Sequence, residues 1–590
     1  MAFSESPAIT VREIDLSGVV PSVSSSTGAI AGNFSWGPVL KPMKIDNEAT
    51  LVETFGAPDT VNTFDFHGAA YFLKYTNALQ VVRVVDSNGV NAYNGGVGTG
   101  PLVKDRDHWD TIEGAQNTDG RNFVAKWAGT LGNSLEVQIC PNSANDAAFD
   151  AWSLKDNFDA APGTSNFATK QNASNDEVHV AIVDKGGSFT GTKNTVLETF
   201  QFLSLALNAK TDDGTSNYIK DVIDTRSEYV WHAGFDSDYS ATAGSRAAAG
   251  TDADSGDNFR LTTGVFAPES GEEDAAATYA LSGGANSTFT GAGGLGKFME
   301  GYDKFIDKDN IQVDLMIAPR ITSRTSSTTL VNHLITIAQS HRKDCVVVTS
   351  PAVSDVVTTT TPVTNSVTGA ATFTSSSYLV VDNNHLKIYD KYNDQYIFIP
   401  AASSTAGIMA NTDFVAAPWF SPAGPRRGQY LGVTSLAYTP TKSERDTLYK
   451  SGINPIANLP GQGILLFGDK TKLARPSAFD RINVRRLFLV IERAIALAAR
   501  NVMFEFNDEF TRAEFVGVVE PFLREIKGRR GITDFRVICD ETNNTPAVID
   551  RNEFIANILI KPARSINFIT LNFVAVRTGV DFEEIAGIGF

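Results

Sequence analysis

The length and charge of the chain exclude several classes of protein before any motif is considered. Its 590 residues exceed what one hydrophobic core usually supports, so several domains are expected. The net charge of −17 does not favour a nucleic-acid groove, which needs a basic stripe. The N-terminus lacks the pattern of a secretory signal, and charged residues interrupt the longest apolar tract, 487–504. No membrane-inserted segment is therefore expected.

The negative charge is concentrated in one segment of the chain. Residues 91–280 hold 28 Asp plus Glu against 13 Lys plus Arg, whereas residues 476–590 hold 16 against 15. A Gly-rich stretch at 95–100 marks the start of the acidic segment. We therefore predict an acidic, solvated domain at 91–280 that is inserted into the rest of the fold.

The first residues predict an N-terminal arm at 1–20. Ile9 and Val11 alternate with polar residues, and the apolar pattern then slips to Ile14, which is typical of a strand with a bulge. No partner strand lies close in sequence.

Residues 21–90 and 281–475 predict an α/β core. A buried strand is expected at 80–85, a second at 311–317, a helix at 330–341 and a third strand at 345–348. This β-α-β order predicts a parallel sheet with right-handed crossovers. Residues 378–399 alternate as an antiparallel hairpin would.

The C-terminal part predicts an α+β domain at 476–564 and an arm at 565–590. Leu487, Ile491 and Ile495 lie on one face of an amphipathic helix. A capping-box pattern places the start of the next helix at Thr511. Strands are expected around 535–540, 553–561 and 565–576.

Several short motifs suggest cofactors, metals or catalysis without the context that these need. Residues 291–296 match G-x-G-x-x-G, but a loop precedes them instead of a strand, and residues 463–471 resemble a phosphate-binding loop that contains an apolar strand. The three cysteines are far apart and suggest buried thiols, neither disulfides nor a zinc site. We expect no cofactor, no metal and no catalytic residue.

Several strings in the C-terminal half resemble one protein family, in order and in spacing. They are 417–424 (APWFSPAG), 444–449 (ERDTLY), 452–456 (GINPI), 466–471 (LFGDKT), 478–487 (AFDRINVRRL) and 561–571 (KPARSINFITL). Residues 123–137 look like a further string of the same family. Together they resemble the contractile tail sheath proteins of long-tailed (myovirus-type) bacteriophages.

The resemblance implies a multidomain α/β and α+β fold. Its parts are a subtilisin-like doubly wound core without a catalytic triad, an inserted β-rich outer domain, and an α+β C-terminal domain that faces the tail tube and bears extended arms. It implies a structural subunit that polymerises as stacked hexameric rings and contracts to drive the tube through the host envelope. The implied partners are other copies of the chain, the tail tube, the baseplate and the tail terminator. The implied location is the virion tail, after assembly in the bacterial cytoplasm.

The resemblance also suggests roles for two groups of residues. Two interpretations stay open for the bases near residue 527. They form a solvated helix end whose cations favour the C-terminal dipole, or they contact an acidic tube. The bases are Arg524, Lys527, Arg529 and Arg530. The apolar residues of the two arms are expected in strands that neighbouring subunits share: Ile9, Val11, Ile14, Ile566, Phe568, Ile569, Leu571 and Phe573.

Two alternatives stay open on the sequence alone. One is the sheath of a headless contractile injection particle. The other is a hydrolase on the doubly wound core, since His67-Gly68 resembles a protease histidine context. We find no Gly-Thr-Ser nucleophile string to complete a triad, which disfavours the hydrolase.

Overall fold

The computed structural model describes residues 26–566, except 96–98, 119–120, 171–175, 206–208, 235–245, 252–257, 263–275 and 290. These residues divide into two compact units. The large unit runs from residue 26 to 418 and from 422 to 493. The C-terminal unit comprises Trp419–Ser421 and residues 494–566.

A six-stranded sheet forms the centre of the large unit. Five of its strands are parallel, and β2 at one edge runs antiparallel to β3. The order is β15 (Leu379–Val381), β14 (Val346–Thr349), β13 (Leu315–Ile317), β1 (Gly28–Gly32), β3 (Leu79–Arg83) and β2 (Pro42–Ile45). The predicted parallel sheet is therefore confirmed.

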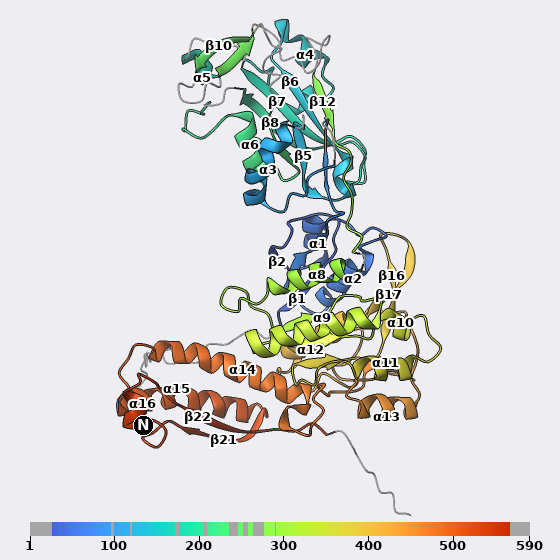
Figure 1. Ribbon diagram of the computed structural model, residues 1–590, viewed down its shortest axis with the longest axis vertical. Helices are drawn as coiled ribbons and strands as arrows, with labels where there is room; N and C mark the ends of the chain where they lie inside the picture. Colours follow the sequence, from blue (N-terminus) through green and yellow to red (C-terminus); the bar gives the residue numbers. More distant parts are fainter. Residues whose placement is uncertain are drawn as a thin grey trace, which may run out of the picture. The chain divides into compact units, whose positions relative to one another are not determined.

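Helices cover both faces of this sheet (Figure 1). Ala29 and Val347 point into one apolar cluster with α8 (Gly291–Asp303) and α9 (Arg324–Thr336). Ile30 and Val348 point into the opposite cluster with α2 (Thr63–Leu73) and α12 (Ala402–Val415). Successive strand residues face opposite sides, so two buried faces require continuous apolar strands. The remaining helices of this α/β region are α1 (Glu48–Phe55), α10 (Val353–Val356), α11 (Pro362–Ala370) and α13 (Lys442–Lys450).

Smaller antiparallel sheets follow the parallel sheet in sequence. β16 (His385–Asp390) pairs with β17 (Gln395–Pro400) and β18 (Ser435–Leu436), and β19 (Ile456–Leu459) pairs with β20 (Gly463–Leu466). The hairpin predicted over 378–399 is wrong in its first part. Leu379–Val381 are all buried and join the parallel sheet, as a strand covered on both faces does.

The acidic segment folds into mostly antiparallel strands. One sheet has the order β12 (Ala277–Ala280), β6 (Leu135–Pro141), β7 (Glu177–Asp184) and β8 (Thr195–Ser204); a second has β4 (Asn91–Tyr93), β5 (Phe123–Ala128) and β9 (Val230–His232); β10 (Arg246–Thr251) pairs with β11 (Asn258–Thr262). Its helices are α3 (Arg106–Thr118), α4 (Ala147–Ala151), α5 (Asn166–Lys170) and α6 (Ile219–Arg226).

Two residues of the α/β region join it to the acidic segment. Trp36 is buried in the apolar cluster of the acidic segment and meets Phe189 edge to face at 5.1 Å. Arg83, 2% exposed, donates to the carbonyls of Phe34 at 2.9 Å, Gly37 at 2.8 Å and Ser35 at 3.3 Å, and also to that of Ala128. The guanidinium therefore ties the loop after β1 to the end of β5.

The C-terminal unit contains two long helices and one small sheet (Figure 1). α14 (Ile482–Ala499) begins in the large unit and ends in the C-terminal unit. α15 (Glu509–Gly528), the short α16 (Pro546–Ile549) and the antiparallel pair β21 (Ile532–Ile538) and β22 (Asn557–Pro562) complete the unit. α15 starts before the predicted Thr511, because the Asp508 side chain caps it by accepting from the Thr511 amide at 2.8 Å.

The compact C-terminal unit takes in the last residues of α14, from Ala494 onward. The first part of α14 is bonded to the large unit, since Arg486 donates to the Met409 carbonyl at 2.7 Å and to Asp413 at 2.6 Å. Arg493 donates to Asp314 and to the Asp344 carbonyl. Burial raises the pKa of Asp314, and the Arg493 guanidinium opposes that rise.

Candidate functional site

The four predicted tube-contact bases lie together at the C-terminal end of α15. Arg524, Lys527, Arg529 and Arg530 are all exposed. Arg530 has a positive φ of 66° just after the helix, which turns the chain into β21. The helix end and the turn after it therefore form one exposed corner of the C-terminal unit.

Acidic side chains of the same chain partly neutralise this corner. Arg524 pairs with Glu520 at 2.7 Å, Lys527 with Asp534 at 3.3 Å, and Arg529 with Glu525 at 3.4 Å. These pairs are solvent-exposed, so each contributes little to stability and leaves the base accessible to another protein. The Arg529 guanidinium also lies 5.0 Å from the ring centroid of Trp419, whose indole donates to the Arg529 carbonyl at 3.1 Å.

Only one of the predicted shared-strand residues lies in the described part of the chain. Ile566 follows β22 and is 81% exposed. The other seven lie outside the described residues: Ile9, Val11, Ile14, Phe568, Ile569, Leu571 and Phe573.

The sheet next to Ile566 is an open one. β21 and β22 pair only with each other among the described residues, with register from Ile538↔Asn557 to Ile532↔Pro562. α15 packs against β21, while alternate residues of β22 are exposed, Leu559 at 54%. A two-stranded sheet is marginally stable by itself and leaves backbone donors and acceptors at its edges.

Sequence reasoning missed a group of exposed apolar residues that lies between α14 and α15 and in the first turn of α15. Met503, Phe504, Phe506 and Phe510 are 58%, 100%, 84% and 76% exposed. We call this group the aromatic loop. The alternation of Phe504 and Phe506 with acidic residues, between two helices, is the signal that marks it in the sequence.

The described residues that resemble a protease site do not assemble one. His67 Nε2 lies 3.0 Å from Asp390 Oδ1, but Thr63 and Asn393 also donate to Asp390, and burial lowers the pKa of His67. No serine hydroxyl among the described residues hydrogen-bonds to His67. A buried structural pair accounts for this geometry, because acyl transfer needs a nucleophile bonded to the histidine.

The expectation that the chain lacks a Gly-Thr-Ser string is wrong, since it occurs at 163–165 and 214–216. The Ser165 hydroxyl donates to Asp176 at 2.6 Å, and the Ser216 hydroxyl donates to Asp221 at 2.7 Å. Both serines stabilise local structure in the acidic segment.

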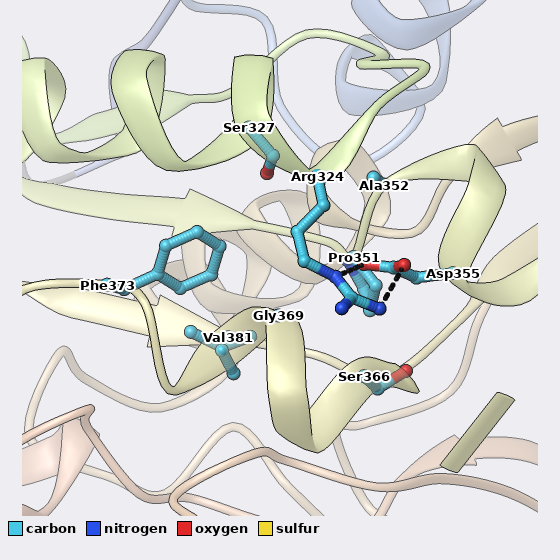
Figure 2. Close-up of a pocket in the computed structure, with 10 residues that line it drawn as sticks. Arg324, Ser327, Pro351, Ala352, Asp355, Ser366, Gly369, Phe373 and Val381 are labelled. Carbon is cyan, nitrogen blue, oxygen red and sulfur yellow. Dashed lines mark hydrogen bonds and ion pairs between the residues drawn. The ribbon is translucent and has the colours of Figure 1, made fainter. Parts of the chain in front are cut away.

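A cavity between α9 and α11 is too small for a substrate. Figure 2 shows Arg324 reaching across it to Asp355, with Ser327, Ser366 and Phe373 around it. Arg324 Nη2 lies 2.7 Å from Asp355 Oδ1, and the cavity volume is about 10 Å³. Such a volume holds about one water molecule.

The described part of the chain also bears on the expectations for metals, membrane spans and thiols. No cluster of His, Cys, Asp and Glu there has the composition of a metal site. None of its helices is long and apolar enough to cross a membrane. Cys140, Cys345 and Cys539 are free and buried, as predicted. Residues 463–466 of the motif that resembles a phosphate-binding loop form the strand β20. The G-x-G-x-x-G residues 291–296 lie at the start of α8, and no strand lies within the described residues 281–289 before them.

Three family models match separate parts of the chain and leave residues 85–295 unmatched. The N-terminal region of domain III of the tail sheath protein Gp18 matches residues 25–84, the phage tail sheath central domain matches 296–472, and the phage tail sheath C-terminal domain matches 474–575. The chain belongs to the phage tail sheath protein family. It is a structural, non-enzymatic subunit of a contractile tail sheath.

Relatives extend the match over the whole length of the chain. The tail sheath protein of Enterobacteria phage T4 is 33% identical, over an alignment that covers 99% of both chains. The tail sheath protein of Vibrio phage KVP40 is 32% identical, again over 99% of both. The crystal structure of the sheath tail protein Lin1278 from Listeria innocua shares the fold, with a TM-score of 0.54 and 13% identity over 92% of this chain and 93% of that one.

Proposed function

We propose that the subunit polymerises as stacked hexameric rings around a tail tube and contracts to drive the tube through the host envelope. The open edge and exposed face of the β21–β22 sheet carry this proposal, because they offer a site where a neighbouring chain adds a strand. Backbone hydrogen bonds in such a joint hold neighbours together while their bodies reorient. Contraction then releases free energy as new surface between bodies is buried, and needs no nucleotide.

The strands that complete this sheet are the two arms. Residues 6–16 contribute Ile9, Val11 and Ile14, and residues 565–576 contribute the apolar row Ile566, Phe568, Ile569, Leu571 and Phe573. An alternating apolar strand without a local partner is stabilised by pairing with another chain.

Deletion of residues 1–16 tests the shared strands. We expect folded subunits with an unchanged circular dichroism spectrum that no longer form tubes or rings in negative-stain microscopy, because the arm adds pairing between subunits and little core burial. Long ordered tubes from the truncated chain, or its unfolding, would show that the arms do not link subunits.

The exposed bases of α15 and its following turn form the surface for an acidic tube protein. Arg524, Lys527 and Arg529 already pair with exposed acids, and an incoming carboxylate replaces these weak pairs at little cost. Arg524→Glu with Lys527→Glu should reduce assembly on purified tubes, and wild-type binding should weaken as salt rises. Unchanged tube binding by this variant leaves these bases as a solvated helix end.

The large unit supplies the body of the subunit. Its doubly covered parallel sheet supports a subtilisin-like ancestry without catalysis, and the net charge of 91–280 supports an outward, solvated position for the acidic segment. The partners are other copies of the chain, the tail tube, the baseplate and the tail terminator, without nucleic acid or membrane insertion, and assembly takes place in the host cytoplasm. Curated relatives from phages favour a phage tail over a headless injection particle. Microscopy of native particles, with or without a head, tests this choice.

A further inference from the structure

The aromatic loop exposes more apolar surface than a free subunit usually leaves in water. Four large side chains within eight residues are 58% to 100% exposed: Met503, Phe504, Phe506 and Phe510. Clustered exposed aromatic and Met side chains are typical of the centres of protein interfaces.

Hydrogen bonds hold the backbone of the loop in place. The Asn507 amide donates to the Glu553 carbonyl at 2.8 Å, and Arg512 donates to the Asn507 side chain at 2.9 Å. Phe504 has a φ of 73°, a conformation that costs free energy for a bulky residue. The bonds around Asn507 restrain the backbone between Phe506 and Phe510, so less of the chain has to be ordered when a partner binds.

The charges of the loop indicate the chemistry of its partner. Glu505, Asp508 and Glu509 are exposed, and no base lies between residues 501 and 511. A complementary partner therefore presents apolar side chains flanked by Lys or Arg and lacks carboxylates.

One segment of the chain itself has this composition. Residues 564–577 (RSINFITLNFVAVR) contain no acid, begin with Arg564, end with Arg577 and hold an apolar run between them. The described chain ends within this segment, at the exposed Ile566. We propose that the aromatic loop is the seat for residues 564–577 of a neighbouring copy.

This inference rests on the proposed sharing of the C-terminal arm and adds a second contact to it. The arm that pairs with the β21–β22 sheet also covers the aromatic loop, whose Asn507 is bonded to Glu553 shortly before β22. The two ends of the contact are different surfaces of one chain, so each copy gives one arm and receives another. Such heterologous contacts generate rings or helical filaments. An arm that docked on its own loop would bury the same rings but link no subunits.

Photocrosslinking tests the seat and its occupant in the intact polymer. Phe506 is replaced by the photoreactive p-benzoylphenylalanine, and polymers are formed from equal amounts of isotopically heavy and light subunits. We expect crosslinked peptides that join position 506 to residues 564–577 and that pair heavy with light chains. Crosslinks within one copy only, or only to other segments or to the tube, would overturn the proposal.

A matched pair of variants measures the contribution of the loop. Phe504→Ser with Phe506→Ser should raise the subunit concentration needed for polymerisation about tenfold or more, with an unchanged unfolding curve. The control is Phe414→Ser with Val415→Ser, which removes side chains that are 62% and 63% exposed on α12 and should leave that concentration unchanged.

Polymerisation of the loop variant at the wild-type concentration, or an equal loss in the control, would contradict the seat. If wild-type subunits form neither rings nor tubes, the proposed function itself fails. If they polymerise without the 506 to 564–577 crosslinks, only the seat fails.

Discussion

The six-stranded sheet of the large unit and the β21–β22 sheet of the C-terminal unit differ in how completely the chain buries their strands. In the six-stranded sheet every strand residue of β1, β13, β14 and β15 is buried, with helices on both faces. In the β21–β22 sheet most residues are exposed or partly exposed, and no further strand covers either edge among the described residues. The large unit is complete as a single chain, whereas the C-terminal unit has the features of a fold that neighbours complete.

The ion pairs differ in the same way. Arg486 and Asp413 have side-chain exposures of 4% and 9%, whereas Arg524 and Glu520 have 69% and 34%. A buried pair cannot lose one partner without leaving a charge uncompensated, but an exposed pair exchanges partners freely. Substitutions in the two units should therefore separate stability from assembly.

The largest loss of stability is expected for Arg83→Met. The buried carbonyls that accept from Arg83 would lose their donor, including that of Ala128 in the acidic segment. We expect the free energy of unfolding to fall by about 4 kcal/mol, measured by chemical denaturation. Arg106→Met, which breaks an exposed pair with Asp110, is the control and should cost less than about 0.5 kcal/mol. Equal effects of the two variants would refute the role of Arg83 as a clamp.

Arg486→Met should have a slightly smaller effect, because α14 keeps its contact through Arg493. It leaves Asp413 without its guanidinium and the Met409 carbonyl without a donor. The expected loss is about 3 kcal/mol in the same denaturation measurement. A loss below about 1 kcal/mol would mean that α14 is attached by its apolar residues alone.

Acid should destabilise the large unit partly through His385. Burial lowers the pKa of this residue to about 4, so the folded state binds fewer protons than the unfolded state between about pH 6.5 and 4. Its contribution to stability is therefore complete above pH 6.5 and is lost as the pH falls towards 4. Compared with His385→Gln, the wild type should lose roughly 3 kcal/mol more across that interval. Parallel pH profiles for the two proteins would exclude this contribution.

The smallest effect on stability is expected at the exposed corner of α15. Arg524→Ala removes an exposed pair with Glu520 and should change the free energy of unfolding by less than about 0.5 kcal/mol. A loss above about 2 kcal/mol would show that this base belongs to the fold of the subunit.

The buried regions were largely predictable from the sequence, and the open regions were not. Val346–Thr349 is a continuous apolar run, and burial on both faces of a parallel sheet produces that pattern. Leu379–Val381 fit the same rule, but the alternation of the neighbouring hairpin was extended over them and hid it. Phe504 and Phe506 were missed, because a periodic pattern reports burial within the chain and these rings are exposed; their alternation with acidic residues between two helices is the signal that marks them. The ion pairs of Arg486 and Arg493 join residues far apart in sequence, which spacing does not reveal.

Hydrogen exchange measured on free subunits and on assembled polymer tests most directly whether neighbours complete the C-terminal unit. We predict that the amides of β14 are equally protected in both forms, since its sheet is already closed. The amides of β21, β22 and the aromatic loop should exchange rapidly in the free subunit and become at least about tenfold slower in the polymer. Equal exchange of the C-terminal unit in the two forms would contradict the account.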